Sequence, residues 1–263
     1  MQSQNNNNNN NNSNNNKLYV VGIGPGSVQD MTIRAQKALE ASEYILGNST
    51  YLDQIAPLLD GKKVIRSYMG AEVERAQKAL ELAENSIVSI ISGGDANIYG
   101  MAGLVLEVAE KKEQTNIEII PGVTAITASA ACLGAPITAD FAVISLSDLL
   151  TPWEIIKERL YAAARADFVI ALYNPKSRKR TGHLKEAIQI ISQEKKPQTP
   201  VGIAQNVTRE GEHTIVTTLG EFMKFYDDVD MRTTILIGNR ESRIWNNADR
   251  VITPRGYHKK YDY

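Results

Sequence analysis

The chain has 263 residues, 43% of them hydrophobic and 22% charged, which is ordinary for a soluble protein with one large or two compact domains. Its formal net charge of −1 argues against a broad nucleic-acid-binding surface, so we expect no nucleic-acid partner. The single cysteine, Cys132, excludes a disulfide framework and a cysteine-ligated iron–sulfur cluster, and it indicates a reducing compartment.

The N-terminal residues carry no targeting pattern. There is no basic region followed by an apolar core, and no apolar run in the chain approaches the length that spans a bilayer. We therefore expect a cytoplasmic protein with no membrane partner. Residues 2–16 are almost pure asparagine, a tract that cannot bury apolar surface, so we expect residues 1–16 to be a disordered arm outside the fold.

From Lys17 onward, predicted strands and helices alternate. Short apolar runs read LYVVGI, EYILG, KKVIRS, SIVSIIS and NIEII, with helical patterns between them at residues 31–42 and 71–84. Such alternation predicts right-handed crossovers and a mostly parallel sheet. Residues 133–141 combine Gly, Pro and Asp without periodicity and are interpreted as a domain link, which gives an N-terminal α/β domain over residues 17–134.

The second half begins again with a strand, AVISLS. A helix is predicted to start at TPWE, with Thr151 as N-cap and Glu154 closing a capping box, and to run to about Arg165. The strand DFVIALY, a helix from about Ser177 to Glu194, and the strands TPVGIAQNV, HTIVTTL and TTILIG follow. The sequence thus predicts a second α/β domain over residues 135–250 and a peripheral tail over residues 251–263.

Three glycine-containing loops follow predicted strands: VGIGPG at 21–26, SGGDANIYG at 92–100 and PGVTAITASAA at 121–131. In open α/β sheets, ligands bind at the edge where such loops lie. The first loop could bind a dinucleotide, but Pro25 removes an amide donor and no acidic residue closes the next strand, which argues against a nicotinamide enzyme. A tight turn with a purely structural role remains the alternative for this loop.

The second and third loops each admit two interpretations. Asp95 either caps the following helix or contacts a ligand, and one role does not exclude the other. The small residues after Pro121 favour tight helix packing, while Thr124 and Ala125 stand at the N-terminal end of that helix, facing the sheet edge.

Taken together and in this order, the three loops resemble those of the tetrapyrrole methylase family of S-adenosylmethionine (SAM)-dependent enzymes. In the second half, SLSDLLTPWE, DFVIALYNPKSRKR, GIAQNVTREGE and TPRGY resemble the branch that methylates C17 of precorrin-3B or of cobalt-factor III and contracts the macrocycle in cobalamin synthesis. The resemblance covers the chain after Lys17. It implies two α/β domains, each a mixed sheet flanked by helices, with SAM in a cleft between them, and a homodimer.

The resemblance also implies cofactor-binding positions. The loop at 92–100 matches the one that holds the methionine part of SAM, and the last six residues of the following list match positions that enclose the adenosine end. Ser27 stands where most relatives outside this branch carry Asp. The implied cofactor residues are Gly24, Pro25, Gly93, Gly94, Asp95, Ile98, Thr124, Ala125, Tyr173, Asn174, Asn206, Val207, Thr233 and Thr234.

A basic cluster over residues 176–180 crowds a predicted helix start, where the macrodipole disfavours cations. A tetrapyrrole carries several carboxylates that arginine can bind in bidentate fashion. We therefore expect Arg178, Arg180 and Arg209, together with Tyr99, to bind substrate; a solvated basic turn is the alternative. Asp148, in the loop SLSDLL, is the candidate acid–base group for ring contraction, and a solvated loop acid is the alternative.

The three histidines, His183, His213 and His258, lack ligand spacing, so no protein-bound metal is expected. Cys132, Trp153 and Trp245 are expected to be packing residues. Two other functions remain open: a methylase of the same fold that acts at another corrin position, on ribosomal RNA or on a modified histidine, and a non-catalytic protein that binds SAM or tetrapyrrole.

Overall fold

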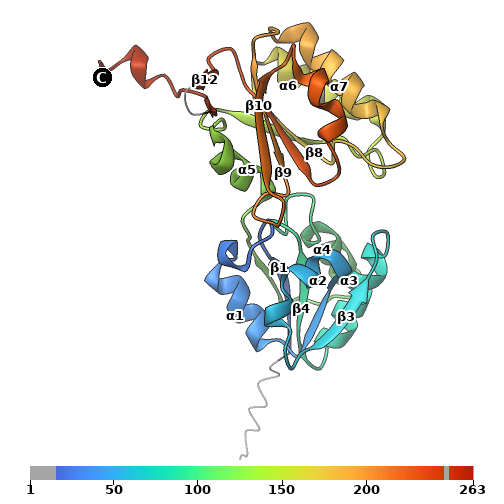
Figure 1. The fold of residues 1–263 in the computed structure, drawn as a ribbon. Coiled ribbons are helices and arrows are strands. Elements are labelled where there is room, and N and C mark those ends of the chain that lie inside the picture. Colours follow the sequence, from blue (N-terminus) through green and yellow to red (C-terminus); the bar gives the residue numbers. More distant parts are fainter. Residues whose placement is uncertain (1–15, 246–248, 263) are drawn as a thin grey trace, which may run out of the picture. The chain divides into compact units, whose positions relative to one another are not determined.

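The computed structural model describes residues 16–245 and 249–262. They form two compact units (Figure 1). Of the described residues, the first unit contains those up to Gly22 together with Thr32–Gly122, and the second contains Ile23–Met31 together with those from Val123 onward. The arm expected at residues 1–16 lies outside the described residues except for Asn16. Among the described residues, no helix is both long and apolar enough to cross a membrane.

The first unit is built on a five-stranded sheet in which every neighbouring pair is parallel. The mostly parallel sheet predicted from the alternation is confirmed for this unit. The mixed sheet implied by the resemblance is wrong for it, because a helical crossover joins each strand to the next and returns the chain to the same edge. The order is β3-β2-β4-β1-β5. The strands are β1 (Lys17–Gly22), β2 (Tyr44–Asn48), β3 (Lys63–Ser67), β4 (Ile87–Ser92) and β5 (Ile117–Ile120).

Helices cover both faces of this sheet. In Figure 1, α1 lies on one side of the sheet, and α3 and α4 lie on the other. Leu80 of α3 and Val105 of α4 join Val20, Val88 and Ile90 of the strands in one buried cluster. Two covered faces explain why the strands read as continuous apolar runs. The helices are α1 (Ile33–Ala41), α2 (Ser49–Gln54), α3 (Glu72–Ala83) and α4 (Ala102–Glu110), with a 3-10 turn, η2, at Ala56–Leu58.

The second unit has a mixed sheet in the order β10-β9-β11-β8-β7, in which only β7 and β8 are parallel neighbours. Here the expected mixed sheet is confirmed. The strands are β7 (Phe141–Ser145), β8 (Val169–Tyr173), β9 (Pro200–Gln205), β10 (His213–Thr218) and β11 (Thr233–Ile237). The helical elements are α5 (Ala125–Leu133), α6 (Trp153–Arg165), α7 (Gly182–Glu194) and the 3-10 helices η1 (Val28–Asp30) and η3 (Phe222–Asp228).

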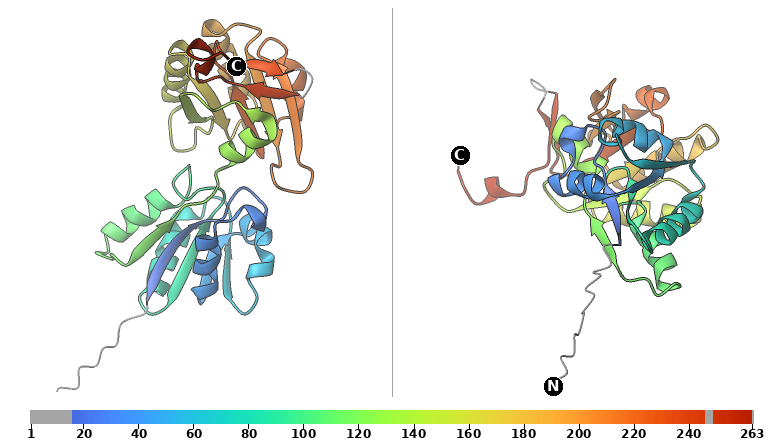
Figure 2. Two further views of the ribbon diagram at one scale, coloured as in Figure 1. Left: turned by 90° about the vertical axis from the view of Figure 1, so that its left-hand side faces the viewer. Right: turned by 90° about the horizontal axis from the view of Figure 1, so that it is seen from below.

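Side-chain alternation along β8 shows how this second sheet is covered. Ile170 and Leu172 join the cluster under α6 and α7, whereas Ala171 joins the cluster under α5. Period-two alternation places these residues on opposite faces, and Figure 1 shows α5 on one side of the sheet and α6 and α7 on the other. Figure 2 gives two further views of the same elements.

The domain division differs from the expected boundary at 134. It falls between Gly122 and Val123, because the buried side of α5 packs on the second sheet. The expected tail likewise begins inside a strand: Val251 of β13 is buried and pairs with Gly134 of β6. This small sheet has the order β12-β13-β6, with β6 (Gly134–Ala135), β12 (Arg243–Trp245) and β13 (Arg250–Ile252), and η5 (Tyr257–Lys259) follows it.

Two predicted helix starts are wrong. The helix α7 begins at Gly182 rather than near Ser177, because Ser177 and Arg180 exchange two backbone hydrogen bonds of 3.0 and 3.2 Å that close a separate turn. The helix α6 has Pro152 rather than Thr151 as its N-cap and makes no side-chain capping bond, so the predicted capping box is not formed. Its end at Arg165 is confirmed.

Candidate functional site

Three glycines of the first unit lie in close backbone contact where β1, β4 and β5 end. A Cβ atom on Gly122 would lie 2.2 Å from the carbonyl oxygen of Gly94, and one on Gly22 would lie 2.7 Å from the Gly122 nitrogen. No side chain fits at these points. Close packing alone therefore requires glycine in the second and third loops, because only residues without a side chain let these loops meet at the carboxyl edge of the sheet.

Asp95 joins those two loops. One of its carboxylate oxygens accepts a hydrogen bond from the Asn97 amide at 2.8 Å, and the other accepts from the Gly122 amide at 2.9 Å. The N-cap of α4 is Met101, without a side-chain capping bond, so the helix-capping interpretation of Asp95 is wrong. An ionised carboxylate has about four acceptor positions, which leaves room for a ligand donor.

The other residues predicted in this loop lie beside Asp95. A Cβ atom on Gly93 would lie 2.6 Å from the ring of Tyr51, so the glycine makes space for that ring. Ile98 and Tyr99 are exposed, and Tyr99 has a φ of 53°, in the left-handed region that non-glycine residues seldom adopt. The first unit thus presents exposed apolar side chains at the edge where its glycine loops meet.

From Ile23 onward, the first glycine loop belongs to the second unit. Arg209 donates a hydrogen bond from Nε to the Pro25 carbonyl at 2.7 Å, and the Ser27 amide donates to Thr208 Oγ1 at 3.1 Å. Gly24 has a φ of 82°, and a Cβ atom on Gly26 would lie 2.3 Å from the Arg209 side chain. Arg209, expected to bind substrate, therefore holds this loop through its Nε.

Strand direction gathers the residues predicted to enclose adenosine. Strands β8 and β9 end at the same edge at which the antiparallel β11 begins, since Thr233 pairs with Gln205 and Ile235 pairs with Leu172. This register brings three predicted pairs to one edge of the second sheet. They are Tyr173 and Asn174, Asn206 and Val207, and Thr233 and Thr234.

The backbone at this edge is strained. Asn174, Asn206 and Thr208 have φ values of 50°, 51° and 60°. Asparagine tolerates this region, but a β-branched threonine there is a genuine outlier, and such outliers cluster at ligand-binding sites. Asn206 also has a buried side-chain oxygen with no hydrogen-bond partner among the described residues, while its Nδ2 donates to the Gly211 carbonyl at 3.3 Å.

Two polar links brace the same edge. The Tyr173 hydroxyl lies 2.6 Å from the Thr124 hydroxyl and accepts a hydrogen bond from the Ile126 amide at 2.7 Å, which ties the N-terminus of α5, including Ala125, to the end of β8. Asp230 accepts a hydrogen bond of 3.1 Å from the Thr233 hydroxyl. Burial raises the pKa of Asp230, but hydrogen bonds from the Arg232 amide and from Gln205 and Thr233 bring the pKa below its ordinary 3.8.

Asp148, the predicted acid–base group, follows β7 and faces two basic side chains. Its carboxylate oxygens lie 3.7 Å from Arg180 Nε and 3.7 Å from His183 Nε2. The His183 ring stacks on Trp153, with centroids 3.9 Å apart. No local pattern places His183 here. The signal that could have found it is the parallel pairing of β7 and β8, because the segments that follow these strands share an edge of the sheet.

The basic cluster divides into anchored and exposed members. The Arg180 side chain is only 11% exposed and donates from Nη1 to the Leu146 carbonyl at 2.7 Å; burial lowers its pKa, and Asp148 opposes that shift. Lys176 Nζ donates to the Tyr226 carbonyl at 3.1 Å. Arg178 and Lys179 are exposed and make no hydrogen bond or ion pair with any residue in the described ranges.

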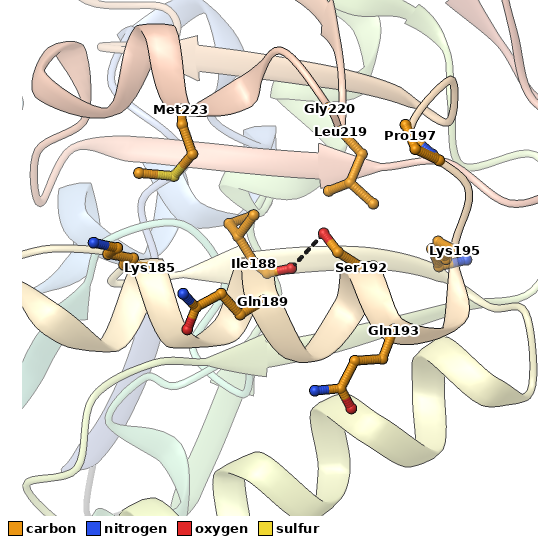
Figure 3. A pocket seen from close by; sticks show the side chains of 10 residues that line it. All are labelled: Lys185, Ile188, Gln189, Ser192, Gln193, Lys195, Pro197, Leu219, Gly220 and Met223. Carbon is orange, nitrogen blue, oxygen red and sulfur yellow. Dashed lines mark hydrogen bonds between the residues drawn. The ribbon is translucent and has the colours of Figure 1, made fainter.

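A cavity of about 480 Å³ lies elsewhere in the second unit, between α7 and the segment that connects β10 to η3 (Figure 3). Ile188, Leu219 and Met223 give the cavity apolar walls. Ser192 Oγ donates a hydrogen bond to the Ile188 carbonyl at 2.7 Å. The ammonium group of Lys195 donates to the Phe168 carbonyl at 2.9 Å. None of the predicted site residues lines this cavity, so it is not the candidate site.

The remaining predictions have mixed outcomes. Trp153 packs as expected: it stacks on His183, and its Nε1 donates to Glu186 at 2.7 Å. Trp245 is 55% exposed, so its packing role is wrong, because β12 turns only Ile244 inward. Cys132 is half-buried, and burial together with Glu212 raises the pKa of its thiol. Within the described ranges, no three His, Cys, Asp or Glu side chains could together hold a metal ion.

Known proteins are similar to this chain over most of its length. A "Probable cobalt-factor III C(17)-methyltransferase" of Salmonella typhimurium is 47% identical over 91% of the chain and 99% of its own length. A "Precorrin-3B C(17)-methyltransferase" of Sinorhizobium sp is 41% identical over 91% and 96%, respectively. The "Cobalamin biosynthesis protein CbiHC" of Archaeoglobus fulgidus is 45% identical over 94% of the chain, which spans only 54% of that longer protein.

The fold has a solved counterpart. The crystal structure of the methyltransferase CobJ covers 91% of this chain, and all of its own chain is matched, with a TM-score of 0.84 and 35% sequence identity. The family model described as Tetrapyrrole (Corrin/Porphyrin) Methylases matches residues 17–223. The chain, with its glycine loops and the strained edge of its second sheet, therefore belongs to the tetrapyrrole methylase family.

Proposed function

We propose that this protein transfers a methyl group from SAM to C17 of precorrin-3B or cobalt-factor III, with ring contraction, in cobalamin synthesis. The observation that carries the proposal is the edge of the second sheet, where register gathers the residue pairs at 173–174, 206–207 and 233–234 around strained backbone. The names of relatives that are 41% and 47% identical supply the position on the macrocycle.

Features of both units fit SAM as the methyl donor. The buried Asn206 oxygen lacks a partner among the described residues and suits an amino group such as that of adenine. Asp95, already fixed by two backbone amides, retains acceptor positions for the amino group of the methionine part. Gly93, Gly94 and Ile98 would contact that part through the loop they form, and Thr124 and Ala125 would contact it from the start of α5.

Bound SAM supplies a methyl group activated by a positively charged sulfur. Since that charge is lost in the transition state, a carboxylate held against the sulfur would stabilise the ground state more and slow transfer. Asp95 therefore has to bind the distant amino group, leaving uncharged backbone near the methyl group. The protein then accelerates transfer mainly by holding donor and acceptor in near-attack geometry.

Ring contraction requires a proton to move at a macrocycle oxygen, and we assign this step to Asp148. Arg180 Nε, at 3.7 Å, orients that carboxylate and compensates its charge. The exposed Arg178 binds substrate carboxylates and Tyr99 contacts the ring, whereas Arg209 acts chiefly by fixing the loop around Gly24 and Pro25. The protein works in the cytoplasm as a homodimer, with neither a bound metal of its own nor a nucleic-acid partner.

The test is anaerobic incubation of the purified protein with carbon-13-methyl SAM and either precorrin-3B or cobalt-factor III. We expect release of S-adenosylhomocysteine, a tetrapyrrole heavier by one methyl group, a changed absorbance spectrum, and a carbon-13 signal at C17 with one of the two substrates. A signal at another carbon would identify a methylase of another corrin position. SAM binding without turnover of either substrate would contradict the proposal and favour a binding protein.

A further inference from the structure

The loop that follows β7 exposes two adjacent leucines. Leu149 is 81% exposed and Leu150 is 92% exposed, and they directly follow Asp148. Met231, in the loop before β11, is also exposed. Exposed large apolar side chains that gather on one part of a surface mark places where another molecule binds.

The guanidinium of Arg180 helps to fix this loop in place. Arg180 donates from Nη1 to the Leu146 carbonyl at 2.7 Å, its Nε lies 3.7 Å from Asp148, and its Nη2 lies 4.0 Å from the Met231 sulfur. His183 adds a second contact, Nδ1 to the Leu146 carbonyl at 3.3 Å. The leucines are therefore presented by an anchored loop, and Met231 is brought to the same anchor.

Two exposed cations belong to the same segment as the anchoring Arg180. Arg178 and Lys179 precede the anchoring Arg180 in sequence, are exposed and lack an ion-pair partner among the described residues. An apolar face next to uncompensated cations complements a flat, conjugated ring with carboxylates at its periphery. A tetrapyrrole has this combination, since the ring can lie on apolar side chains while its carboxylates pair with cations.

We infer that Leu149, Leu150 and Met231, with Arg178 and Lys179, form the surface that recognises the macrocycle, here called the leucine face. Arg180 is then a positioning residue that holds the face together rather than a direct ligand of the substrate. This inference rests on the proposed function and adds to it a set of apolar contacts. It places the ring against the loop that carries Asp148.

The test is the double variant Leu149→Ser and Leu150→Ser, with Leu106→Ser on α4 of the first unit as the control. All three leucines are exposed, so we expect the variants to fold. We expect the double variant to raise KM for the tetrapyrrole by about tenfold or more, since apolar contact area is lost. SAM affinity, measured by calorimetry, should not change, and the control should match the unaltered protein in both quantities.

Charge and positioning are tested separately. Arg178→Glu with Lys179→Glu should raise KM most at low salt, because screening weakens the lost attraction. Arg180→Gln should raise KM without changing SAM affinity, and Arg180→Lys should partly restore it. Unchanged KM in the double leucine variant would overturn the inference. If light scattering also showed that this variant no longer forms a dimer, the leucines would instead contact a second copy of the chain.

The inference and the proposed function fail in different ways. If the unaltered protein neither turns over nor binds precorrin-3B or cobalt-factor III in an absorbance titration, both are wrong. If it turns over one of them and the leucine variants behave as the unaltered protein does, only the leucine face is wrong. Binding without turnover, weakened in the leucine variants, would support the face and contradict the methyltransferase.

Discussion

The hydroxyl of Tyr173, at the end of β8, lies 2.6 Å from the hydroxyl of Thr124 at the start of α5. The same Tyr173 oxygen accepts a hydrogen bond from the Ile126 amide, one of the amides that a helix start leaves without an internal partner. A strand residue thus caps a helix whose own N-cap side chain makes no capping bond. Both residues were predicted separately as cofactor contacts.

Tyr173→Phe should therefore weaken both stability and cofactor binding. Loss of the hydroxyl leaves the Ile126 amide without its partner, and we expect the free energy of unfolding to fall by about 1–3 kcal/mol. SAM affinity should fall as well, because the start of α5 is no longer held to β8. Urea denaturation and calorimetry measure the two effects. Tyr161→Phe, on α6, is the control, and an equal loss in both variants would contradict the capping role.

Gly122→Ala should destabilise the first unit. The added Cβ would meet the Gly94 carbonyl at 2.2 Å, so the loops after β4 and β5 would have to separate, and Asp95 would lose its bond from the Gly122 amide. Overpacking of this kind costs about 1–3 kcal/mol. We expect that loss in urea denaturation, together with weaker SAM binding.

Gly103→Ala is the matched control for that clash. A Cβ atom there would meet nothing within 4 Å, and the residue lies inside α4. Alanine is the better helix former, so this variant should gain about 0.5–1 kcal/mol. If both glycine variants lose stability, the close backbone contact among the loops is not the reason why position 122 requires glycine.

Arg75→Met should leave the stability of the first unit nearly unchanged. The Arg75 side chain is 5% exposed, its Nε is buried without a partner among the described residues, and burial lowers its pKa. The cost of burying this charge offsets its bonds to Ser67 Oγ and the Tyr68 carbonyl, and methionine fills the same space. Arg75→Ala, which leaves a cavity, should lose about 2 kcal/mol or more in urea denaturation. Equal losses would show that the charge itself is needed.

Alternation of apolar runs and helical patterns was enough to predict the first sheet. Each strand there is covered on both faces, so burial leaves a direct signal in the sequence. The position of the domain boundary left no such signal. The small residues of α5 would suit packing on either sheet, and only the tertiary structure shows that Ile126 and Leu133 face the second one.

The candidate site was partly predictable for a similar reason. Glycines at strand ends carry a local signature, and the loops containing Asn174 and Asn206 were found by resemblance. The partners of Asp148 could not be predicted, because Arg180 and His183 come close to it only through the pairing of β7 with β8. Likewise, the fixation of Arg209 on Pro25 joins residues 184 positions apart, which no local pattern encodes.

Asp230→Asn should make stability less sensitive to acid. The folded pKa of Asp230 lies below its ordinary 3.8, so its ionised form contributes stability above pH 3.8 that is lost as the pH falls through the folded value. In urea denaturation over a pH series, the unaltered protein should have a larger free energy of unfolding than the variant at neutral pH. The difference in free energy should shrink below pH 3.8. Asp60→Asn, at an exposed position, is the control; a difference independent of pH would contradict the assignment.

Asp148→Asn should separate contraction from cofactor binding. Asparagine preserves the size of the side chain but cannot carry a proton at the macrocycle, and loss of general acid–base catalysis typically costs about a hundredfold or more. We expect unchanged SAM affinity by calorimetry, and a contracted product that forms more slowly by that factor in mass and absorbance measurements. Asp227→Asn, at a fully exposed acid near Lys176, should leave both unchanged. Undiminished contraction in Asp148→Asn would make Asp148 a solvated loop acid, held by Arg180 and His183 only to shape the leucine face.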